Sequence, residues 1–529
     1  MLTFFVMIPI LIAVLLYLFA STKTGRVIAI VVQAMLVALS CYLFYLSRTE
    51  DIVTFIGIRY GSLGIMLLAD SLSSVFVLLT SFLFLIAAIY SFHENNTRLF
   101  WFLLFIWEGV LIGIFLARDL FNIFVLMEVA AIIVVILIMF NRENRTLYDG
   151  AIYLMANLVA IQFYLLGVGY VYMITGTLDI YLAGHAIANL DSSSVILPYA
   201  LIMTAVAFKC ALLPLFSWLP KAHGTPSAPS SVSAILSGLH IKSAVYLFLR
   251  FQEVFQAVSA SDFFLVVGIV TGIGGFIMAL SQKDIKLILA YHTVSQVGLI
   301  MAALNIGDSY SHIGGLYHII NHALFKSGLF LSAGVIAEVY KTREVYKIRG
   351  VLRRIPVVGT ATLMAVLGIT GAPLFNGSIS KYFISAGSNW PLTGILIFMS
   401  LGTIISFIKY STMLFGDPGE NLAPVKVDKC RQFTTFTLGL FCFLGGIFGA
   451  RFIEILFGVT ARVDTLGYLE KTGIFALNLL VGYLIYKHFV KTSRLLRYIS
   501  APRLNFRGMC ASLTAFFAVM LIVVNQLSK

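Results

Sequence analysis

Apolar runs of about 20 residues, repeated along nearly the whole chain, constrain this sequence more than any other feature. Runs such as 2–20, 27–47 and 120–140 do not alternate polar and apolar residues, so they fit helices and not the strands of a β-barrel. Of the 529 residues, 60% are hydrophobic and 11% are charged, whereas a soluble domain carries about 25% charged residues. We therefore expect an all-α polytopic membrane protein, and a soluble globular enzyme is excluded.

The distribution of basic residues predicts the topology. We count 16 candidate spans and expect about 14–16 transmembrane helices. Loops that follow odd-numbered spans contain 23 Lys and Arg residues, and loops that follow even-numbered spans contain 7. Because cytoplasmic loops are enriched in Lys and Arg, this bias predicts odd loops in the cytoplasm and both termini outside. The predicted location is the cell inner (plasma) membrane.

Several classes of cofactor are disfavoured by what the sequence lacks. The five cysteines form no CxxC pair, which disfavours a zinc site or an iron–sulfur cluster. No glycine-rich nucleotide-binding motif follows a strand. The net charge of +13 is carried mostly by short loops, so it reports orientation and not nucleic-acid binding. We predict no cofactor and no metal site, and whether the chain belongs to an enzyme depends on redox chemistry in partner proteins.

Two spans contain helix-breaking residues at similar places. The segment 208–229 of span 7 holds four prolines, and the segment 367–383 of span 12 holds two glycines that flank a proline. Both contain the tripeptide Pro-Leu-Phe, at 214–216 and 373–375. The two spans are five apart, so the second copy is inverted relative to the first. Interrupted helices at matching positions of an inverted repeat point to the ion path of a transporter.

Ionisable residues of the first half lie inside predicted spans. Glu128 lies in span 5 among apolar neighbours, Lys209 in span 7 and Lys242 in span 8. Buried charges must face the interior, pair or reach water, so we interpret Glu128 as a proton-carrying carboxylate and the lysines as switchable proton sites. The structural alternatives are an ion pair at Glu128 and packing against broken span 7 at Lys242. Glu108, in span 4, is either a supporting second acid or a structural hydrogen-bonding group.

The second half contains two further intramembrane lysines. Lys381 follows the break in span 12. It either passes protons to an exit path or caps the carbonyls that the break frees. Lys409 lies near the predicted cytoplasmic end of span 13, where it either supports the path or extends its ammonium towards water.

A row of basic residues occupies span 11. His318, His322 and Lys326 are spaced by four, which places all three on one helical face and suits a hydrated proton relay. His292, one span earlier, is a supporting extension of this row. A metal site is disfavoured because no carboxylate shares the face.

Together these motifs resemble the antiporter-like membrane proteins of Mrp Na+/H+ antiporters, respiratory complex I and membrane-bound hydrogenases. The strings that carry the resemblance are DLFNIFVLMEV (119–129), FKCALLPLFSWLPKAHGTPSAPSSVSAILSGLHIKSAVYL (208–247), YHTVSQVG (291–298), HIINHALFKSGLF (318–330) and GAPLFNGSISKYF (371–383). Among the branches, the lysine in SGLHIKSAVYL makes the chain most similar to the Mrp D subunit.

The resemblance implies a set of functional positions and a fold. The family's functional residues fall on Glu128, Lys209, Lys242, His318, His322, Lys326 and Lys381. Two inverted five-helix repeats, each with a proton half-channel, are expected at 99–250 and 262–415. They are flanked by N-terminal helices at 1–98 and by C-terminal helices at 416–529, which are candidates for the docking of other subunits.

The implied function is proton translocation in a multisubunit cation/proton antiporter of the Mrp Na+/H+ type. Protons would pass from Lys209, whose affinity Glu128 sets, through the basic row to Lys381. The expected partners are other membrane subunits, lipids, H+ and Na+. The alternative is a proton-pumping subunit of a complex I-like NADH-quinone oxidoreductase or membrane-bound hydrogenase, in which partners carry out the redox chemistry. An autonomous solute transporter and a membrane scaffold are disfavoured by the many buried lysines.

Overall fold

A computed structural model provides the structure of this chain. It describes residues 1–19, 23–60, 63–94, 96–140, 143–224, 228–417, 425–491, 493, 496 and 504–527. Among these residues, 14 helices are long and apolar enough to cross a membrane, or up to 15 if one bent pair forms a single span. The chain divides into two compact units. The predicted all-α polytopic fold is confirmed.

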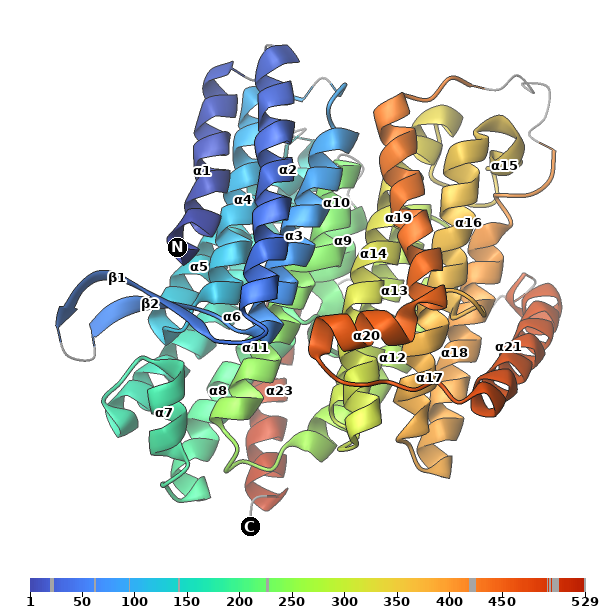
Figure 1. The fold of residues 1–529 in the computed structure, drawn as a ribbon. Helices are drawn as coiled ribbons and strands as arrows, with labels where there is room; N and C mark the ends of the chain where they lie inside the picture. The colour runs from blue at the N-terminus through green and yellow to red at the C-terminus, as the bar shows by residue number, and fades with distance from the viewer. Residues whose placement is uncertain are drawn as a thin grey trace. The chain divides into compact units, whose positions relative to one another are not determined.

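The first unit comprises residues 1–228, 239–263 and 504–529. Its elements are α1 (Leu2–Phe19), α2 (Lys23–Leu46), β1 (Ile52–Tyr60), β2 (Leu63–Ala69), α3 (Ser71–Tyr90), α4 (Arg98–Leu116), α5 (Leu120–Ile138), α6 (Asn144–Thr175), α7 (Ile180–Ile187), α8 (Ser192–Lys209), η1 (Leu215–Ser217), α9 (Trp218–Gly224), α11 (Ile241–Val254) and α23 (Phe506–Leu527). α1 packs against α4, α2 against α3, and α6 against α8 (Figure 1). The last helix, α23, returns to this unit and packs against α8 and α6.

The second unit comprises residues 229–238 and 264–503. Its elements are α10 (Ser230–Ile235), most of α12 (Ser261–Ser281), α13 (Ile285–Leu304), α14 (Ser309–Tyr340), α15 (Val351–Arg354), α16 (Pro356–Thr370), α17 (Asn376–Ala386), α18 (Trp390–Ser411), α19 (Lys429–Ile447), α20 (Gly449–Phe457), α21 (Thr465–Ile485) and η3 (Tyr486–Val490). The almost completely buried α14 is the centre of this unit, and it packs against α10, α13, α16, α17 and α19.

Both predicted breaks are present. α8 ends at Lys209, and the chain crosses Cys210–Pro214 before it becomes helical again. α16 ends at Thr370, and α17 begins only at Asn376. The second break explains why span 12 is not among the helices of membrane length: α16 has only 15 residues. Pro226, one of the four prolines of span 7, lies outside the described residues.

A two-stranded antiparallel sheet was not expected from the sequence. β1 pairs with β2 in a register that sets Ile52 opposite Ala69 and Ile56 opposite Ile65. The third span therefore begins only at Ser71, after this sheet. Asp70 ends the strand and begins α3, because its side chain accepts a hydrogen bond from the Ser73 backbone N–H in a capping box.

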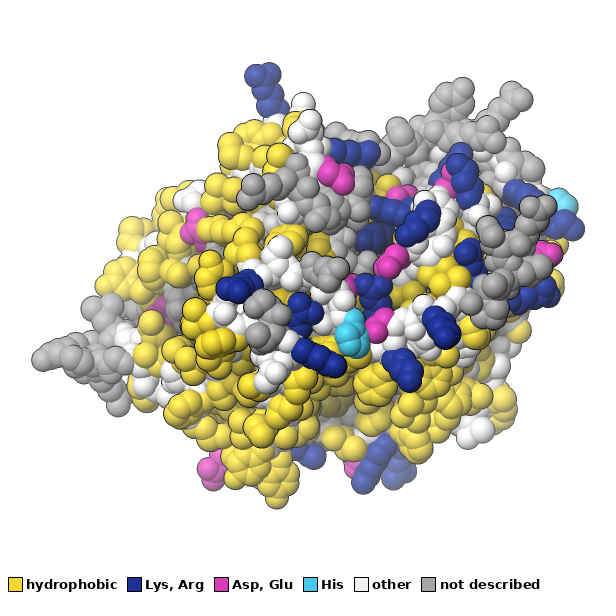
Figure 2. All heavy atoms as spheres, turned by 90° about the horizontal axis from the view of Figure 1, so that it is seen from above, with side chains coloured by type: hydrophobic (Ala, Val, Ile, Leu, Met, Phe, Trp, Pro, Cys, Tyr) yellow, Lys and Arg dark blue, Asp and Glu magenta, His cyan; other side chains and the backbone are white. Residues whose placement is uncertain are grey.

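Contacts within the first unit agree with the predicted alternation of loops. Arg26 Nη1 donates to the carbonyl oxygen of Phe92 at 2.8 Å, which joins the loops after spans 1 and 3. Arg118 and Asp179 form an ion pair at 2.7 Å that joins the loops after spans 4 and 6. Figure 2 shows Lys and Arg side chains gathered on the face seen from above. The orientation of this face relative to the cell remains a prediction.

Candidate functional site

In the first unit, the break after α8 brings Lys209 under the influence of Glu128. Lys209 is the last residue of α8 and is 6% exposed, while Glu128 lies half-buried on α5. The charge of Glu128 acts on Lys209, although no direct ion pair joins the two in the described part of the chain. Trp218 Nε1 donates to the Phe208 carbonyl at 2.8 Å, so the break leaves this backbone oxygen satisfied. Glu128 thus acts on Lys209 through its charge without a direct contact in the described part of the chain.

His240 is a member of this site that the sequence reasoning missed. It ends a π-helical turn, η2 (Leu236–His240), whose last two residues belong to the first unit. The charge of Lys209 acts on its imidazole, and Nε2 lies 3.5 Å from the Tyr153 hydroxyl. Single π turns are frequent at functional sites. Its only signal in the sequence was its place two positions before Lys242. Lys242 itself is fully buried on α11.

In the second unit, His318 joins three helices through its two ring nitrogens. Nδ1 lies 2.8 Å from Ser380 Oγ on α17, and Nε2 lies 3.0 Å from Gln296 Oε1 on α13. An amide oxygen only accepts, so Nε2 carries a proton, and in the neutral imidazole Nδ1 then accepts from the serine hydroxyl. Gln296 Nε2 in turn donates to Thr403 Oγ1 on α18 at 3.4 Å. The neighbour of Ser380 in the chain is Lys381, so His318 contacts the segment that carries the second broken-helix lysine.

The rest of the predicted basic row is also buried in the second unit. His322 and Lys326 are both 0% exposed on α14, and the Lys326 ammonium donates to the Leu289 carbonyl at 2.7 Å. His292 on α13 is 0% exposed, and neither ring nitrogen has a hydrogen-bond partner in the described part of the chain. The charges of Lys326, Lys381 and Lys409 all act on it. The structure therefore brings together predicted residues from spans 10 to 13.

Lys381 lies between a broken helix and a cavity. Its ammonium donates to the carbonyls of Ile369 and Thr370, at 3.1 and 3.0 Å, which are the last residues of α16. Gly371 has φ +80°, a conformation that favours glycine, and a Cβ there would lie 2.9 Å from Lys381 Cδ and crowd this contact. The side chain also lines a cavity of about 90 Å³, together with Tyr382 and Ser385 of α17 and Tyr468, Lys471 and Asn478 of α21.

Lys409 lies apart from this cavity. It is 2% exposed near the end of α18, and its ammonium donates to the carbonyls of Leu280, at 2.8 Å, and Gln282. These carbonyls belong to the C-terminal end of α12, where a cation is stabilised by unpaired backbone oxygens. Its contacts are those of a helix cap.

Glu108 is buried in a different part of the first unit. It is 0% exposed on α4 and accepts a hydrogen bond from Gln33 Nε2 on α2 at 2.5 Å. None of the other predicted site residues contacts it among the described residues.

Acidic residues outside the spans have structural partners. Burial alone would raise the pKa of the Asp70 carboxyl, but the adjacent Arg250 guanidinium and the Ser73 N–H hold it below its usual value. Burial raises the pKa of Asp119, which caps α5 through the Asn122 N–H at 2.6 Å. These groups order the loop ends of the first unit.

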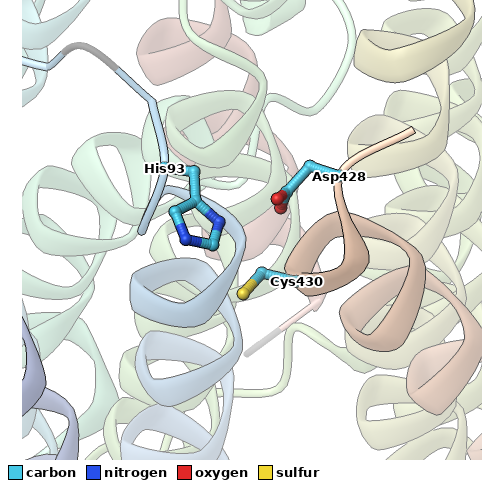
Figure 3. Close-up of side chains that lie close together, drawn as sticks. All are labelled: His93, Asp428 and Cys430. Atoms are coloured by element: carbon cyan, nitrogen blue, oxygen red, sulfur yellow. The ribbon is translucent and has the colours of Figure 1, made fainter. Parts of the chain in front are cut away.

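Three side chains with potential metal-ligand atoms are drawn in Figure 3. His93 belongs to the first unit, and Asp428 and Cys430 belong to the second.

The fold and these buried groups define a class: polytopic helical membrane proteins with ionisable side chains at two broken helices. Within this class, the chain belongs to the family of NADH:quinone oxidoreductase/Mrp antiporter transmembrane proteins, whose family description matches residues 117–406. The resemblance predicted from the sequence motifs is thereby confirmed. The matched region contains all the intramembrane residues predicted for the site except Glu108 and Lys409.

Curated relatives come from both kinds of complex. The chain is 34% identical over 275 residues to the N-type subunit of the NADH-quinone oxidoreductase of Desulforudis audaxviator, covering 50% of this chain and 54% of that protein. It is 32% identical over 284 residues to the A-type subunit of a Na(+)/H(+) antiporter of Bacillus subtilis, covering 49% and 35%. The D-type subunit of the Na(+)/H(+) antiporter of Alkalihalophilus pseudofirmus is 29% identical over 271 residues, covering 50% and 55%. The chain therefore matches about half or less of each relative's length.

Solved structures share the fold over nearly the whole chain. A chain of the Mrp complex from Dietzia sp. superposes with a TM-score of 0.78 at 21% identity, covering 92% of this chain and 98% of that one. A chain of respiratory complex I from Thermus thermophilus gives a TM-score of 0.77 at 22% identity, covering 90% and 100%. Both structures are multisubunit membrane assemblies, and at this identity the likeness establishes the fold.

Proposed function

We propose that this chain conducts protons as a subunit of a multisubunit cation/proton antiporter of the Mrp Na+/H+ type. The observation that carries the proposal is that each unit holds a buried lysine at a helix break. Lys209 is the last residue before the break in the first unit, and the Lys381 ammonium contacts the end of α16 at the break in the second. Broken helices expose backbone dipoles inside a membrane and recur at ion paths. The Na(+)/H(+) antiporter proteins among the relatives support this reading.

The first unit is proposed to control loading of the path. An ammonium buried in an apolar bundle is stabilised by a nearby carboxylate and releases its proton when that carboxylate withdraws. Glu128 acts on Lys209 without contacting it directly. His240 then offers the next acceptor, with Lys242 buried on the same helical segment.

The second unit is proposed to form the relay and the exit. The groups that take up and release protons there are the buried side chains of His292, His318, His322 and Lys326. Ser380 provides a hydroxyl between His318 and the backbone that carries Lys381. The cavity beside Lys381 leads the proton away along α21, which gives this additional helix a role at the exit.

Location and partners follow from the same proposal. We place the chain in the cell inner (plasma) membrane with both termini outside, because the odd-numbered loops are the basic ones. Its partners are other membrane subunits, lipids, H+ and Na+. Exposed apolar side chains beside Glu128 on α5, such as Val125 and Ile132, provide a surface for lipid or a neighbouring protein.

The test uses the complete complex expressed with its partner proteins in inside-out membrane vesicles. We expect Lys209→Ala to abolish cation-dependent dissipation of a pH gradient while the complex still assembles. Lys347→Ala is the matched control, because this lysine is 68% exposed on a loop and pairs with the nearby Glu344 at 2.8 Å. Full transport by Lys209→Ala would remove this lysine from the path.

The second candidate function is a redox-driven pump of the complex I type, which the match to the NADH-quinone oxidoreductase protein favours. The proteins that co-purify with the chain separate the two. Small membrane proteins alone indicate the antiporter, and soluble proteins with flavin or iron–sulfur clusters indicate the pump.

A further inference from the structure

Glu108 is a fully buried carboxyl with an unsatisfied oxygen. Gln33 Nε2 donates to Glu108 Oε1, whereas Glu108 Oε2 and Gln33 Oε1 have no partner in the described part of the chain. Both side chains are 0% exposed. Two acceptor oxygens without a donor carry the full cost of leaving water. A proton on Glu108 would remove the negative charge and turn Oε2 from an acceptor into a donor.

No positive side chain compensates Glu108 among the described residues. Its neighbours α1, α3 and β2 contain no Asp, Glu, Lys, Arg or His. The charged groups on the other adjoining elements are Lys23 and Arg26 on α2, Glu128 on α5, and Lys242, Arg250 and Glu253 on α11. In the part of the chain that the structure describes, the one polar partner of Glu108 is Gln33. The charged groups just named form no polar contact with it there, and neither do the tyrosines and cysteines of these elements. The negative charge of an ionised Glu108 would therefore have no positive side chain beside it among the described residues.

A seam of hydroxyl groups leads away from Glu108 between α2 and α3. Gln33 and Ser40 lie seven residues apart on α2, as Ser74 and Ser81 do on α3, so each pair shares one helical face. Ser47 continues this spacing in the turn that follows α2. Ser40 Oγ lies 2.9 Å from Ser81 Oγ, and Ser47 Oγ donates to Ser74 Oγ at 2.6 Å.

The two ends of this seam differ. At one end, Gln33 Nε2 donates both to Glu108 and to the Ser81 carbonyl, the latter at 3.1 Å. At the other end, the Ser74 N–H donates to the carbonyl of Asp70, the residue that caps α3 at the loop. Serine pairs alone bring helices close together, but close packing does not require a buried carboxyl at the end of the row.

We propose that Glu108 is a second proton-binding carboxyl of the first unit, reached along the Ser47–Ser74 and Ser40–Ser81 seam from the loop end at Asp70. It is separate from the Glu128–Lys209 pair. The ligand is a proton, and Gln33 is the positioning residue that holds the carboxyl. This inference does not depend on the transport function proposed above, because proton occupancy of a carboxyl is measurable in the resting protein.

The test is labelling of the complete complex in membrane vesicles with dicyclohexylcarbodiimide. A protonated carboxyl adds across the carbodiimide and rearranges to a stable N-acylurea, with no leaving group. We expect the α4 peptide to be labelled at Glu108, with a yield that falls about tenfold per pH unit once the carboxyl ionises. Glu253→Gln, at a carboxylate with 58% exposure on α11, is the control and should leave the yield unchanged.

Two results would overturn the assignment. One is an unlabelled Glu108 across pH 6–9 while other carboxyls in the same sample react. The other is suppression of labelling by NaCl but not by choline chloride at constant pH, which would identify a cation site in place of a proton site. Both measurements are made on the unmodified chain, so they do not depend on whether a Glu108 variant folds.

The route is tested separately by a Ser40→Ala/Ser81→Ala double variant. After a pH jump on the side of the Asp70 loop, labelling at Glu108 should respond several-fold more slowly than in the parent chain. Thr80→Ala is the matched control, because the Thr80 hydroxyl on α3 donates to the Phe76 carbonyl of its own helix. An unchanged response in the double variant would exclude the seam as the route.

Discussion

The two units stabilise their buried cations by different means. In the first unit, Lys209 is acted on by a carboxylate, Glu128, from a neighbouring helix. In the second, Lys326 donates to the carbonyl of Leu289, and Lys381 donates to carbonyls at the end of α16. A carboxylate can swing away or take up a proton, whereas a backbone carbonyl is held in place by its helix. Under the proposed function, this difference would assign control to the first unit and conduction to the second.

The largest expected effect tests this division directly. Glu128→Gln keeps the shape of the side chain but removes the charge that acts on Lys209, so we expect cation-dependent proton transport to fall by about a hundredfold. The measurement is dissipation of a pH gradient in inside-out vesicles that contain the whole complex. Lys347→Ala again serves as the control. Unchanged transport in Glu128→Gln would contradict this division, because it would show that Lys209 needs no carboxylate partner.

A second prediction separates two lysines within the second unit. Lys381→Ala should also lower transport by about a hundredfold, because it removes the group that faces the cavity. Lys409→Ala should retain most transport and instead lower the free energy of unfolding by about 1–3 kcal/mol, since carbonyls at the end of α12 lose their donor. Transport assays and thermal melting of the purified complex distinguish these outcomes. Loss of transport without loss of stability in Lys409→Ala would place this lysine on the path.

A third, smaller effect concerns the backbone that holds Lys381. Gly371→Ala forces an alanine into a left-handed conformation, at a cost of about 1–2 kcal/mol. It also crowds the Lys381 side chain, so transport should fall several-fold. Gly394→Ala, in the exposed part of α18 with nothing within 4 Å of an added Cβ, is the control. Equal transport by the two variants would show that the contact between Lys381 and the carbonyls at the end of α16 is dispensable for transport.

The smallest effect lies outside the spans and depends on pH. Because Arg250 holds the pKa of Asp70 below its usual value, the pair contributes stability fully above about pH 4 and loses it as the pH falls through the lowered pKa. Asp70→Asn should cost about 2 kcal/mol at neutral pH and flatten this acid-side loss in thermal melts. Glu253→Gln, which removes the second and more exposed carboxylate beside Arg250, should change little. An Asp70→Asn melt as pH-dependent as the parent would contradict this assignment.

Much of the fold was predictable because a membrane helix is determined by the residues of its own segment. Apolar length gave the spans, and prolines and glycines located both breaks. The β1–β2 sheet was not predicted, because a strand next to an apolar span reads as an extension of that span, and only the capping of α3 by Asp70 separates them.

The site was predictable as a set of residues but not as a set of contacts. The four-residue spacing of His318, His322 and Lys326 placed them on one face of a buried helix. By contrast, the link from His318 to Gln296 and Ser380 depends on how three helices cross, which no local pattern encodes. His240 was missed because the π turn that shifts its direction leaves no signature in the sequence.

One wall of the cavity beside Lys381 is formed by α21, and the opposite face of this helix is exposed. On this helix, the side chains of Leu466, Leu469 and Leu480 are 77%, 59% and 60% exposed. Inside, the Tyr468 hydroxyl lies 2.9 Å from Ser378 Oγ and accepts from the Leu374 N–H at 3.1 Å, at the broken end of span 12. Tyr468 therefore links α21 directly to the break that Lys381 contacts, so the position of α21 and the shape of the cavity beside this lysine are coupled.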